Sequence, residues 1–422
     1  MFLHLKRRIG KYAAIFLFLI LCLSAVPAKV FAADVTTDAI PGWPKGPEPF
    51  YSDTAVLIEA STGAVLYDKG MDEIRYPASI TKIMTTIIAL ENSNLTDTVT
   101  FTDTACALAI PGNAKIDAKP GEVLTMEQCL YAVMLASANE VACQVAIQIA
   151  GSEAAFADMM NAKAAEIGCT NTHFTNASGL QDENHYTTAH DMALIMQYAI
   201  QNQDFLTITG TLSYTIPATN MSAERTLSTH NAMMVPGDYY YEGTFSGKPG
   251  NTGEAGSTLV TAATRNNMTL ICVVLKAADG GQSVTDTISL MDYGYNNFTM
   301  TDISALQPEL SGTVILPNGV DFSSLTAQEN NSDGQTVTTL YYYQNHYLGT
   351  ATKSAGTEKD SSGTSEPLPS ESFSNNETVS DSGNETFSAA SRILILILSL
   401  MIVAGLVAIV LGLRKNKKRK RR

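Results

Sequence analysis

Residues 54–60 and 64–68 are short, largely apolar runs that contain β-branched and aromatic residues, and they flank the turn Ser61-Thr62-Gly63. Two short runs of this kind on both sides of a glycine turn predict a β-hairpin. Residues 257–264 and 268–276 repeat the pattern around Arg265-Asn266-Asn267. Between the two hairpins, apolar residues recur with helical spacing, which predicts helices over residues 79–90, 125–151, 153–167 and 189–201.

The order of these elements predicts the architecture. Strands at both ends of residues 34–302, with helices between them, favour a mixed α/β (α+β) domain. In such a domain the two ends complete one antiparallel sheet, and the helices form a separate lobe. The next segment, residues 303–351, holds only short strand patterns and predicts a small all-β domain.

Both ends of the chain carry an apolar run beside basic residues. Residues 1–33 place a basic stretch before the apolar run and end in small residues, which is the order of a secretory signal peptide. A retained membrane anchor is the alternative for this segment. Residues 391–413 contain an uncharged apolar stretch long enough to span a bilayer, and the basic residues 414–422 favour a cytoplasmic C-terminus. We therefore expect a single-pass membrane protein whose middle section is extracellular.

The middle section is strongly acidic. All 41 Asp and Glu residues lie within residues 34–390, which contain only 13 of the 27 Lys and Arg residues, so 13 − 41 gives a net charge of −28. This charge excludes a nucleic-acid partner that is bound through phosphate neutralisation. Residues 352–390 are rich in Ser, Thr, Glu and Asn, and they predict a disordered linker between the folded domains and the membrane.

Ser79 and Lys82 lie at the start of the first predicted helix. A spacing of three residues places the hydroxyl and the ammonium on one helix face. The free N–H groups of a first helical turn favour developing negative charge near Ser79. Burial and positive neighbours would lower the pKa of Lys82 and let it accept the serine proton. The alternative is a helix-capping serine followed by a solvated lysine.

Two further motifs follow in order along the chain. Ser137-Ala138-Asn139 lies where one helical stretch ends and another begins, and Lys248-Pro249-Gly250 precedes the strand at residue 257. Ser-x-x-Lys, Ser-x-Asn and Lys-x-Gly in this order form the signature of serine acyl-transfer enzymes that react with penicillins. With residues 76–85 (YPASITKIMT), 173–195 and 254–275, the chain resembles the low-molecular-mass penicillin-binding proteins, the serine-type D-alanyl-D-alanine carboxypeptidases. The resemblance covers residues 50–300 firmly and 312–353 weakly.

This resemblance implies a β-lactamase/transpeptidase-like fold in a bacterial cell-membrane enzyme. The implied enzyme removes the terminal D-alanine from peptidoglycan stem peptides and binds β-lactam antibiotics, without a cofactor or a metal. Ser79 would be the acylated nucleophile and Lys82 its proton acceptor, with Ser137 and Asn139 also catalytic. The implied substrate-binding residues are Lys248, Gly250, Asn251 and Thr252, and the backbone N–H groups of Ser79 and Asn251 would form the oxyanion hole.

One departure from the family pattern bears on activity. The family usually reads Lys-Thr-Gly where this chain has Lys248-Pro249-Gly250, and proline removes both a hydroxyl and a backbone N–H. We expect weaker recognition of the substrate carboxylate, with Thr252 as a possible substitute for the hydroxyl. Two alternatives stay open: a β-lactamase-like hydrolase, or a catalytically impaired cell-wall-binding protein. A zinc site is a further alternative, at Asp182, His185, His190 and Asp191, although a polar loop is favoured there.

Overall fold

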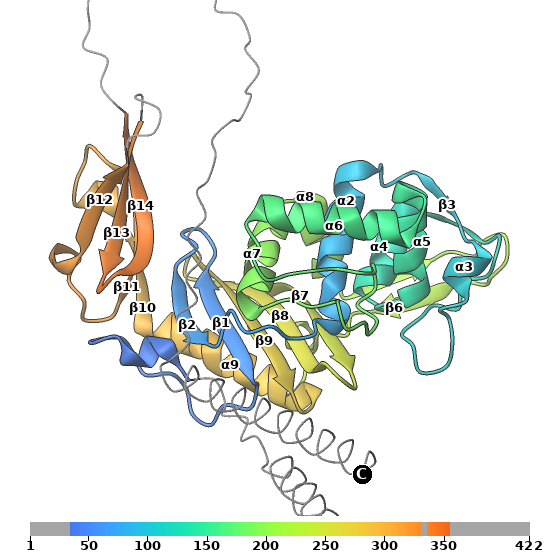
Figure 1. Cartoon of the computed structure of the whole chain (residues 1–422), viewed down its shortest axis with the longest axis horizontal. Helices are drawn as coiled ribbons and strands as arrows, with labels where there is room; N and C mark the ends of the chain where they lie inside the picture. The colour runs from blue at the N-terminus through green and yellow to red at the C-terminus, as the bar shows by residue number, and fades with distance from the viewer. Residues whose placement is uncertain (1–33, 331–335, 355–422) are drawn as a thin grey trace, which may run out of the picture. The chain divides into compact units, whose positions relative to one another are not determined.

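The computed structural model describes residues 34–330 and 336–354. The first domain is built on a five-stranded antiparallel sheet with the order β2-β1-β9-β8-β7 (Figure 1). Its strands are β1 (Thr54–Glu59), β2 (Val65–Lys69), β7 (Thr244–Thr252), β8 (Gly256–Arg265) and β9 (Met268–Ala277). Strands β1 and β9 come from opposite ends of the domain, and β1 pairs along its whole length with residues 270–275 of β9. This pairing confirms the predicted closure of the sheet by the two ends of the domain, and β7 forms one open edge.

The two faces of this sheet bury different sets of side chains. Val56 and Ile58 of β1 belong to a core shared with the helical lobe, whereas Ala55 and Leu57 belong to a second core on the opposite face. Helix α7 packs on β1 and β9, and α9 packs on β8 and β9 (Figure 1). Because successive side chains of a strand point to opposite faces, the almost continuous apolar runs of β8 and β9 match burial on both sides.

The helical lobe contains the predicted helices, and one of the predicted helical stretches is divided into two helices. The bounds are α2 (Lys82–Asn92), α3 (Asp103–Cys106), α4 (Met126–Met134), α5 (Asn139–Ala150), α6 (Glu153–Ile167), α7 (Ala189–Ala199) and α8 (Gln203–Gly210). Two small two-stranded sheets accompany them, β3 (Thr98–Thr100) with β4 (Val123–Thr125), and β5 (Ser213–Ile216) with β6 (Arg225–Ser228). The helical stretch predicted over 125–151 is two helices that meet at the predicted junction, where the chain turns at Ser137, whose φ of 57° is left-handed.

Helix α9 (Gly280–Asn297) was not predicted, for a physical reason. Its buried face includes Ser283, Asp286 and Thr287, so the apolar periodicity that indicates a helix is interrupted by polar residues. Asp286 is fully buried because its carboxylate accepts hydrogen bonds from the backbone N–H and the hydroxyl of Ser52, both at 2.6 Å. The helix covers the sheet face that lies opposite the lobe.

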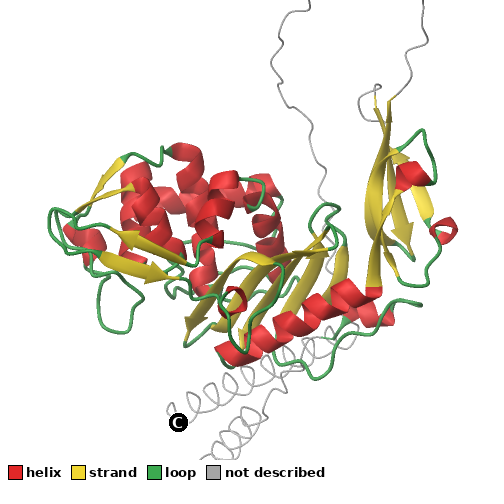
Figure 2. Cartoon of the chain, turned by 180° about the vertical axis from the view of Figure 1, so that it is seen from behind, coloured by secondary structure: helices red, strands yellow, loops and turns green. Residues whose placement is uncertain are grey.

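A second five-stranded antiparallel sheet follows α9 (Figure 2). Its order is β10-β11-β14-β13-β12, with β10 (Phe298–Asp302), β11 (Ser311–Pro317), β12 (Thr326–Asn330), β13 (Thr336–Tyr343) and β14 (His346–Ser354). The sheet therefore begins a few residues before the predicted start of the small β domain and ends a few residues after its predicted end. His346 Nε2 lies 2.6 Å from the carbonyl oxygen of Val65 in β2, which joins this sheet to the first domain.

The predicted signal peptide (1–33), membrane span (391–413) and basic tail (414–422) lie outside the described residues, as does nearly all of the predicted linker. Within residues 34–330 and 336–354, no helix has the length and apolarity that crossing a membrane requires.

Candidate active site

Ser79 lies in a short 3-10 turn, η2 (Ala78–Thr81), and not in the first turn of the α-helix that follows. Ala78 has a φ of 52°, an uncommon conformation for a residue with a side chain. The turn is held from the sheet, because the hydroxyl of Thr258 donates to the Pro77 carbonyl at 2.9 Å. Ser79 is therefore presented by a constrained backbone at the junction of the lobe and the sheet.

Lys82 is fully buried beside the serine. Its Nζ donates to Ser79 Oγ at 3.1 Å, to Asn139 Oδ1 at 2.7 Å and to the carbonyl oxygen of Ser178. Burial lowers the pKa of Lys82 well below its usual value, the charge on Lys248 lowers this pKa further, and the Glu140 carboxylate opposes both effects. A lysine whose pKa is lowered in this way, next to a serine hydroxyl, is the arrangement that general-base activation requires.

A second buried lysine reaches the Ser-x-Asn turn from β7. Lys248 is 1% exposed, and its Nζ donates to Ser137 Oγ at 3.0 Å and to the Pro249 carbonyl at 2.9 Å. Burial lowers the pKa of Lys248 to about 7. Asn139 opens α5, and its backbone N–H donates to the Ala114 carbonyl at 2.9 Å. The three sequence motifs thus meet in one network of side chains.

Strand β7 runs directly against the Ser79 turn. A Cβ added at Gly250 would lie 2.8 Å from the Ser79 backbone nitrogen and 2.5 Å from Thr258 Oγ1, so glycine is needed at this approach. The backbone N–H groups of Ser79 and of the exposed Asn251 therefore lie on neighbouring segments. This is the placement that an oxyanion hole requires.

Pro249 does not interrupt the strand. It pairs with Leu259 of β8, and β7 is continuous from Thr244 to Thr252. Alternate residues of a strand direct their N–H groups to the same edge. Because proline has no N–H, β7 lacks a donor at position 249 on the edge to which the Asn251 N–H points. The hydroxyl oxygen of Thr252 accepts from the Ala255 N–H at 3.1 Å and closes the turn into β8. The substrate-binding role of Thr252 stays a prediction.

Several residues that the motif search did not select support the site. The Asn176 side chain accepts hydrogen bonds from the N–H groups of Ser178, Gly179 and Leu180, and this loop presents the Ser178 carbonyl to Lys82. The Asn-Ala-Ser-Gly-Leu run at 176–180 is the sequence signal for this loop. Residue types alone do not reveal which backbone carbonyl of the loop accepts a hydrogen bond from Lys82. Glu140, buried behind the Ser-x-Asn turn, accepts from the Ile116 N–H at 2.7 Å.

The residues of the zinc alternative have other partners. His185 Nδ1 accepts from the Thr175 N–H at 3.1 Å, and its Nε2 lies 2.8 Å from Thr81 Oγ1. Burial lowers the pKa of His185 to about 4, so the ring is neutral. Asp191 accepts from the Asn171 N–H, and His190 Nδ1 lies 3.0 Å from Asp72. Among the described residues, no three His, Cys, Asp or Glu side chains are grouped to hold a metal ion.

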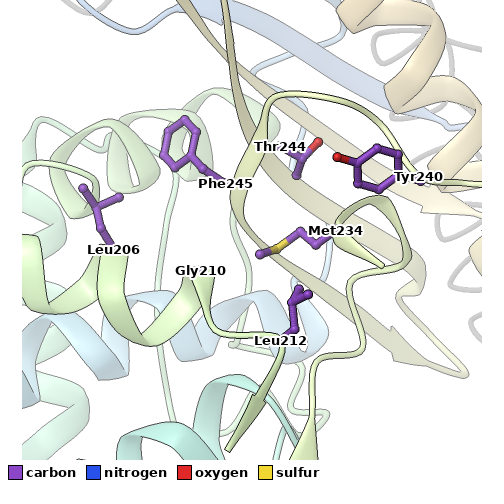
Figure 3. Close-up of a pocket in the computed structure, with 7 residues that line it drawn as sticks. All are labelled: Leu206, Gly210, Leu212, Met234, Tyr240, Thr244 and Phe245. Carbon is purple, nitrogen blue, oxygen red and sulfur yellow. The ribbon is translucent and has the colours of Figure 1, made fainter. Parts of the chain in front are cut away.

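A separate hollow of about 580 Å³ lies at the first residues of β7 (Figure 3). Its lining is largely apolar and contains none of the motif residues: Leu206, Gly210, Leu212, Met234, Tyr240, Thr244 and Phe245.

The family model described as D-alanyl-D-alanine carboxypeptidase (Peptidase_S11) matches residues 44–279, which include all three motifs. The chain belongs to this family. A curated D-alanyl-D-alanine carboxypeptidase of Bacillus subtilis (strain 168), DacF, is 31% identical over 65% of this chain and 70% of its own length. The D-alanyl-D-alanine carboxypeptidase DacA of Escherichia coli (strain K12) is 30% identical over 61% of this chain and 63% of its own length, which is less than two thirds.

Solved structures extend the comparison to the fold. A Mycobacterium tuberculosis H37Rv D-alanyl-D-alanine carboxypeptidase superposes with a TM-score of 0.56 and 27% identity, over 61% of this chain and 95% of that chain. The Streptomyces K15 DD-transpeptidase superposes with a TM-score of 0.56 and 28% identity, over 60% of this chain and 100% of that chain. The mixed α/β fold predicted from the sequence is therefore the transpeptidase-like fold of the D-alanyl-D-alanine carboxypeptidase family.

Proposed function

We propose that this chain is a serine-type D-Ala-D-Ala carboxypeptidase that removes the terminal D-alanine from peptidoglycan stem peptides. The observation that carries the proposal is the position of Lys82, whose Nζ lies 3.1 Å from Ser79 Oγ. Burial lowers the pKa of this side chain, which favours its role as a base. The membership of the chain in the D-alanyl-D-alanine carboxypeptidase family identifies the class of bond.

Acylation begins when Lys82 takes the proton of Ser79 as Oγ attacks the carbonyl carbon of the penultimate D-alanine. The N–H groups of Ser79 and Asn251 stabilise the oxyanion. The carbon–nitrogen bond then breaks, and the departing amine receives the proton that Lys82 took, through the hydroxyl of Ser137. The products of this step are free D-alanine and an ester on Ser79.

Deacylation repeats the chemistry with water as the nucleophile. Lys82 takes a proton from the water as it adds to the ester carbonyl, and the Ser79 oxygen leaves with a proton returned by Lys82. The shortened peptide departs with a carboxylate. The protonated side chain of Lys248 binds the terminal carboxylate of the incoming peptide. The backbone at Gly250 and Asn251 contributes to the same binding.

Release of D-alanine from a stem pentapeptide, measured with the purified protein and its Ser79→Ala variant, tests the activity. We expect release by the first protein only, and covalent labelling by a fluorescent penicillin in the same pattern. Labelling of Ser79→Ala would contradict the assignment of the nucleophile. Rapid turnover of penicillin would favour a β-lactamase-like hydrolase, and a protein that neither labels nor releases D-alanine would favour a cell-wall-binding protein.

We also propose that the enzyme is a single-pass bacterial membrane protein with its catalytic domain outside the cell. The support is compositional: residues 391–413 are apolar, residues 414–422 are basic, and the acids are confined to residues 34–390. Fractionation of cells that express residues 1–422 or 1–390 tests this topology. We expect penicillin-labelled protein in the membrane with the longer chain and in the medium with the shorter one. Membrane retention of the shorter chain would contradict anchoring by the C-terminal segment.

A further inference from the structure

A charged cavity of about 350 Å³ lies next to the Ser79 turn. Its wall includes Tyr76, three residues before Ser79, and Tyr186 of the loop that leads into α7. Glu254 closes the cavity from the turn between β7 and β8. The cavity is therefore formed by the nucleophile's own segment, by the lobe and by the end of the edge strand.

The direction of β7 defines which part of a substrate meets this cavity. Lys248, proposed to bind the terminal carboxylate, comes first along the strand, and Asn251, proposed for the oxyanion hole, comes three residues later. The part of the peptide that precedes the scissile bond therefore continues toward Glu254. At most about 10 Å separates the Cα atoms of Asn251 and Glu254, because one extended residue spans about 3.3–3.6 Å. The residue that precedes D-Ala-D-Ala is attached directly to the acylated alanine. A long side chain on that residue can therefore extend over about 10 Å, as far as Glu254.

Within the part of the chain that the structure describes, only one of the three carboxylates in the wall of the cavity forms ion pairs. Asp53 interacts with both cations of the wall, at 3.7 Å from Arg75 Nε and 3.9 Å from Lys276 Nζ. Glu183 and Glu254 are exposed, and neither has an ion-pair partner within 4 Å among the described residues. Three carboxylates against two cations leave one negative charge in excess, and the two carboxylates without partners are free to bind a cation.

We propose that this cavity binds the side-chain ammonium of the diamino acid that precedes D-Ala-D-Ala in the stem peptide. The inference rests on the proposed carboxypeptidase function and names a specificity-determining element of it. Glu183 and Glu254 supply the charge, and the rings of Tyr76 and Tyr186 line the path of the aliphatic part of the side chain. Arg75 is paired with Glu73 at 2.7 Å and with Asp53, and Lys276 is paired with Asp53, so these ion pairs reduce the repulsion between the two cations and the ligand.

The test compares two tripeptides that differ only in the charge of the side chain. Nα-acetyl-L-Lys-D-Ala-D-Ala has a free ammonium, whereas Nα,Nε-diacetyl-L-Lys-D-Ala-D-Ala has none. We expect Glu183→Gln/Glu254→Gln to lower kcat/KM for the free-amine peptide about three- to tenfold, the effect of two partly exposed charge contacts, and to leave the diacetyl peptide unchanged. The preference for the free amine should also weaken as the salt concentration rises.

A matched control and a charge reversal make the test selective. Glu309→Gln/Glu329→Gln removes two exposed carboxylates of the small β domain and should change neither peptide. Glu183→Lys/Glu254→Lys should instead favour a peptide whose lysine carries an Nε-succinyl group. Equal effects on both lysine peptides, or no effect on either, would overturn the inference. Failure of the unmodified protein to release D-alanine from any peptide would count against the proposed function instead.

Two diamino acids supply the same ammonium, and a further arm separates them. A meso-diaminopimelate peptide carries a carboxylate beside its side-chain ammonium, and this group would face Lys276. If Lys276→Gln lowers kcat/KM for the diaminopimelate peptide alone, the cavity is selective for that residue. Equal kinetics of Lys276→Gln on both peptides would assign the cavity to the ammonium alone. Loss of the Glu183 and Glu254 effect with both substrates would again overturn the inference.

Discussion

Lys248 combines burial with a charge that its proposed role needs. Because burial lowers its pKa to about 7, the ammonium is present below that pH and is lost above it. We expect KM for a D-Ala-D-Ala peptide to be lowest below about pH 7 and to rise toward tenfold per pH unit above it. Steady-state kinetics from pH 5.5 to 9 measure this.

The control for this pH profile is Lys248→Arg, whose guanidinium stays protonated throughout the range. This variant should lose the alkaline rise in KM even if its overall rate falls. A KM of the unmodified enzyme that is constant from pH 6 to 9 would contradict the role of the Lys248 charge.

Pro249 gives a second prediction at the residue scale. Threonine at this position restores a hydroxyl, and it restores an N–H on the edge of β7 that also presents the Asn251 N–H. We expect Pro249→Thr to lower KM for the peptide by an amount equivalent to about 1.5 to 3 kcal/mol, the contribution of one charge-assisted hydrogen bond. Pro249→Ala restores only the N–H, so comparison of the two variants isolates the hydroxyl. Unchanged kinetics in Pro249→Thr would refute the hypothesis of weakened recognition.

Residue types reveal the chemistry of this site but not all of its contacts. The spacing of Ser79 and Lys82, and the order of the three motifs, were sufficient to select the residues that meet in the structure. The Ser178 carbonyl was not predictable, because it is a backbone acceptor presented by a loop that Asn176 shapes. The two glutamates of the charged cavity come from segments 71 residues apart, and only the fold brings them together.

At the scale of elements, the site depends on the contact between the 176–180 loop and the Ser79 turn. Gly179 has a φ of 82°, and a Cβ there would lie 1.8 Å from the Ala78 carbonyl oxygen. We expect Gly179→Ala to displace the turn and to slow acylation by penicillin at least tenfold, because nucleophile and base must keep their geometry. Stopped-flow labelling measures the acylation rate.

The matched control is Gly151→Ala at the end of α5. Gly151 has a similar φ of 78°, but a Cβ there meets nothing within 4 Å. This variant has the same backbone strain, of order 1 kcal/mol, without the collision. We expect a small loss of thermal stability and normal acylation. If both variants acylate at the same rate, the contact between Gly179 and Ala78 does not position the nucleophile.

Element boundaries were predictable where local pattern and tertiary environment agree. Strands β1, β8 and β9 and helices α6 and α7 lie close to their predicted ranges. The break between α4 and α5 lies at the junction that was predicted at Ser137-Ala138-Asn139, although the residues on both sides of it are apolar and buried. Helix α9 was missed because hydrogen bonds make polar residues acceptable on its buried face.

At the scale of the molecule, the first domain and the small β domain share a core. Trp43, the only tryptophan of the chain, is 5% exposed and donates to the Leu66 carbonyl at 2.9 Å. Its ring packs edge-on against Phe298 and His346, at centroid distances of 5.4 and 4.7 Å. This contact lies far along the chain from the three motifs and joins the N-terminal segment to the second sheet.

We expect Trp43→Ala to lower the free energy of unfolding by about 3 to 5 kcal/mol, the usual cost of truncating a buried aromatic residue. Acylation of the folded variant by penicillin should stay normal, because no motif residue contacts this ring. Urea unfolding followed by circular dichroism measures the stability. A loss below about 1 kcal/mol would show that the two sheets stabilise each other little.

The position of Pro249 on the open edge of β7 has a consequence for solubility. An edge strand that exposes a complete row of N–H and C=O groups can recruit a strand of another molecule. Because Pro249 has no N–H to donate, the row is interrupted beside the catalytic serine. Two copies of the enzyme therefore cannot join their β7 edges by a ladder that continues past the catalytic serine.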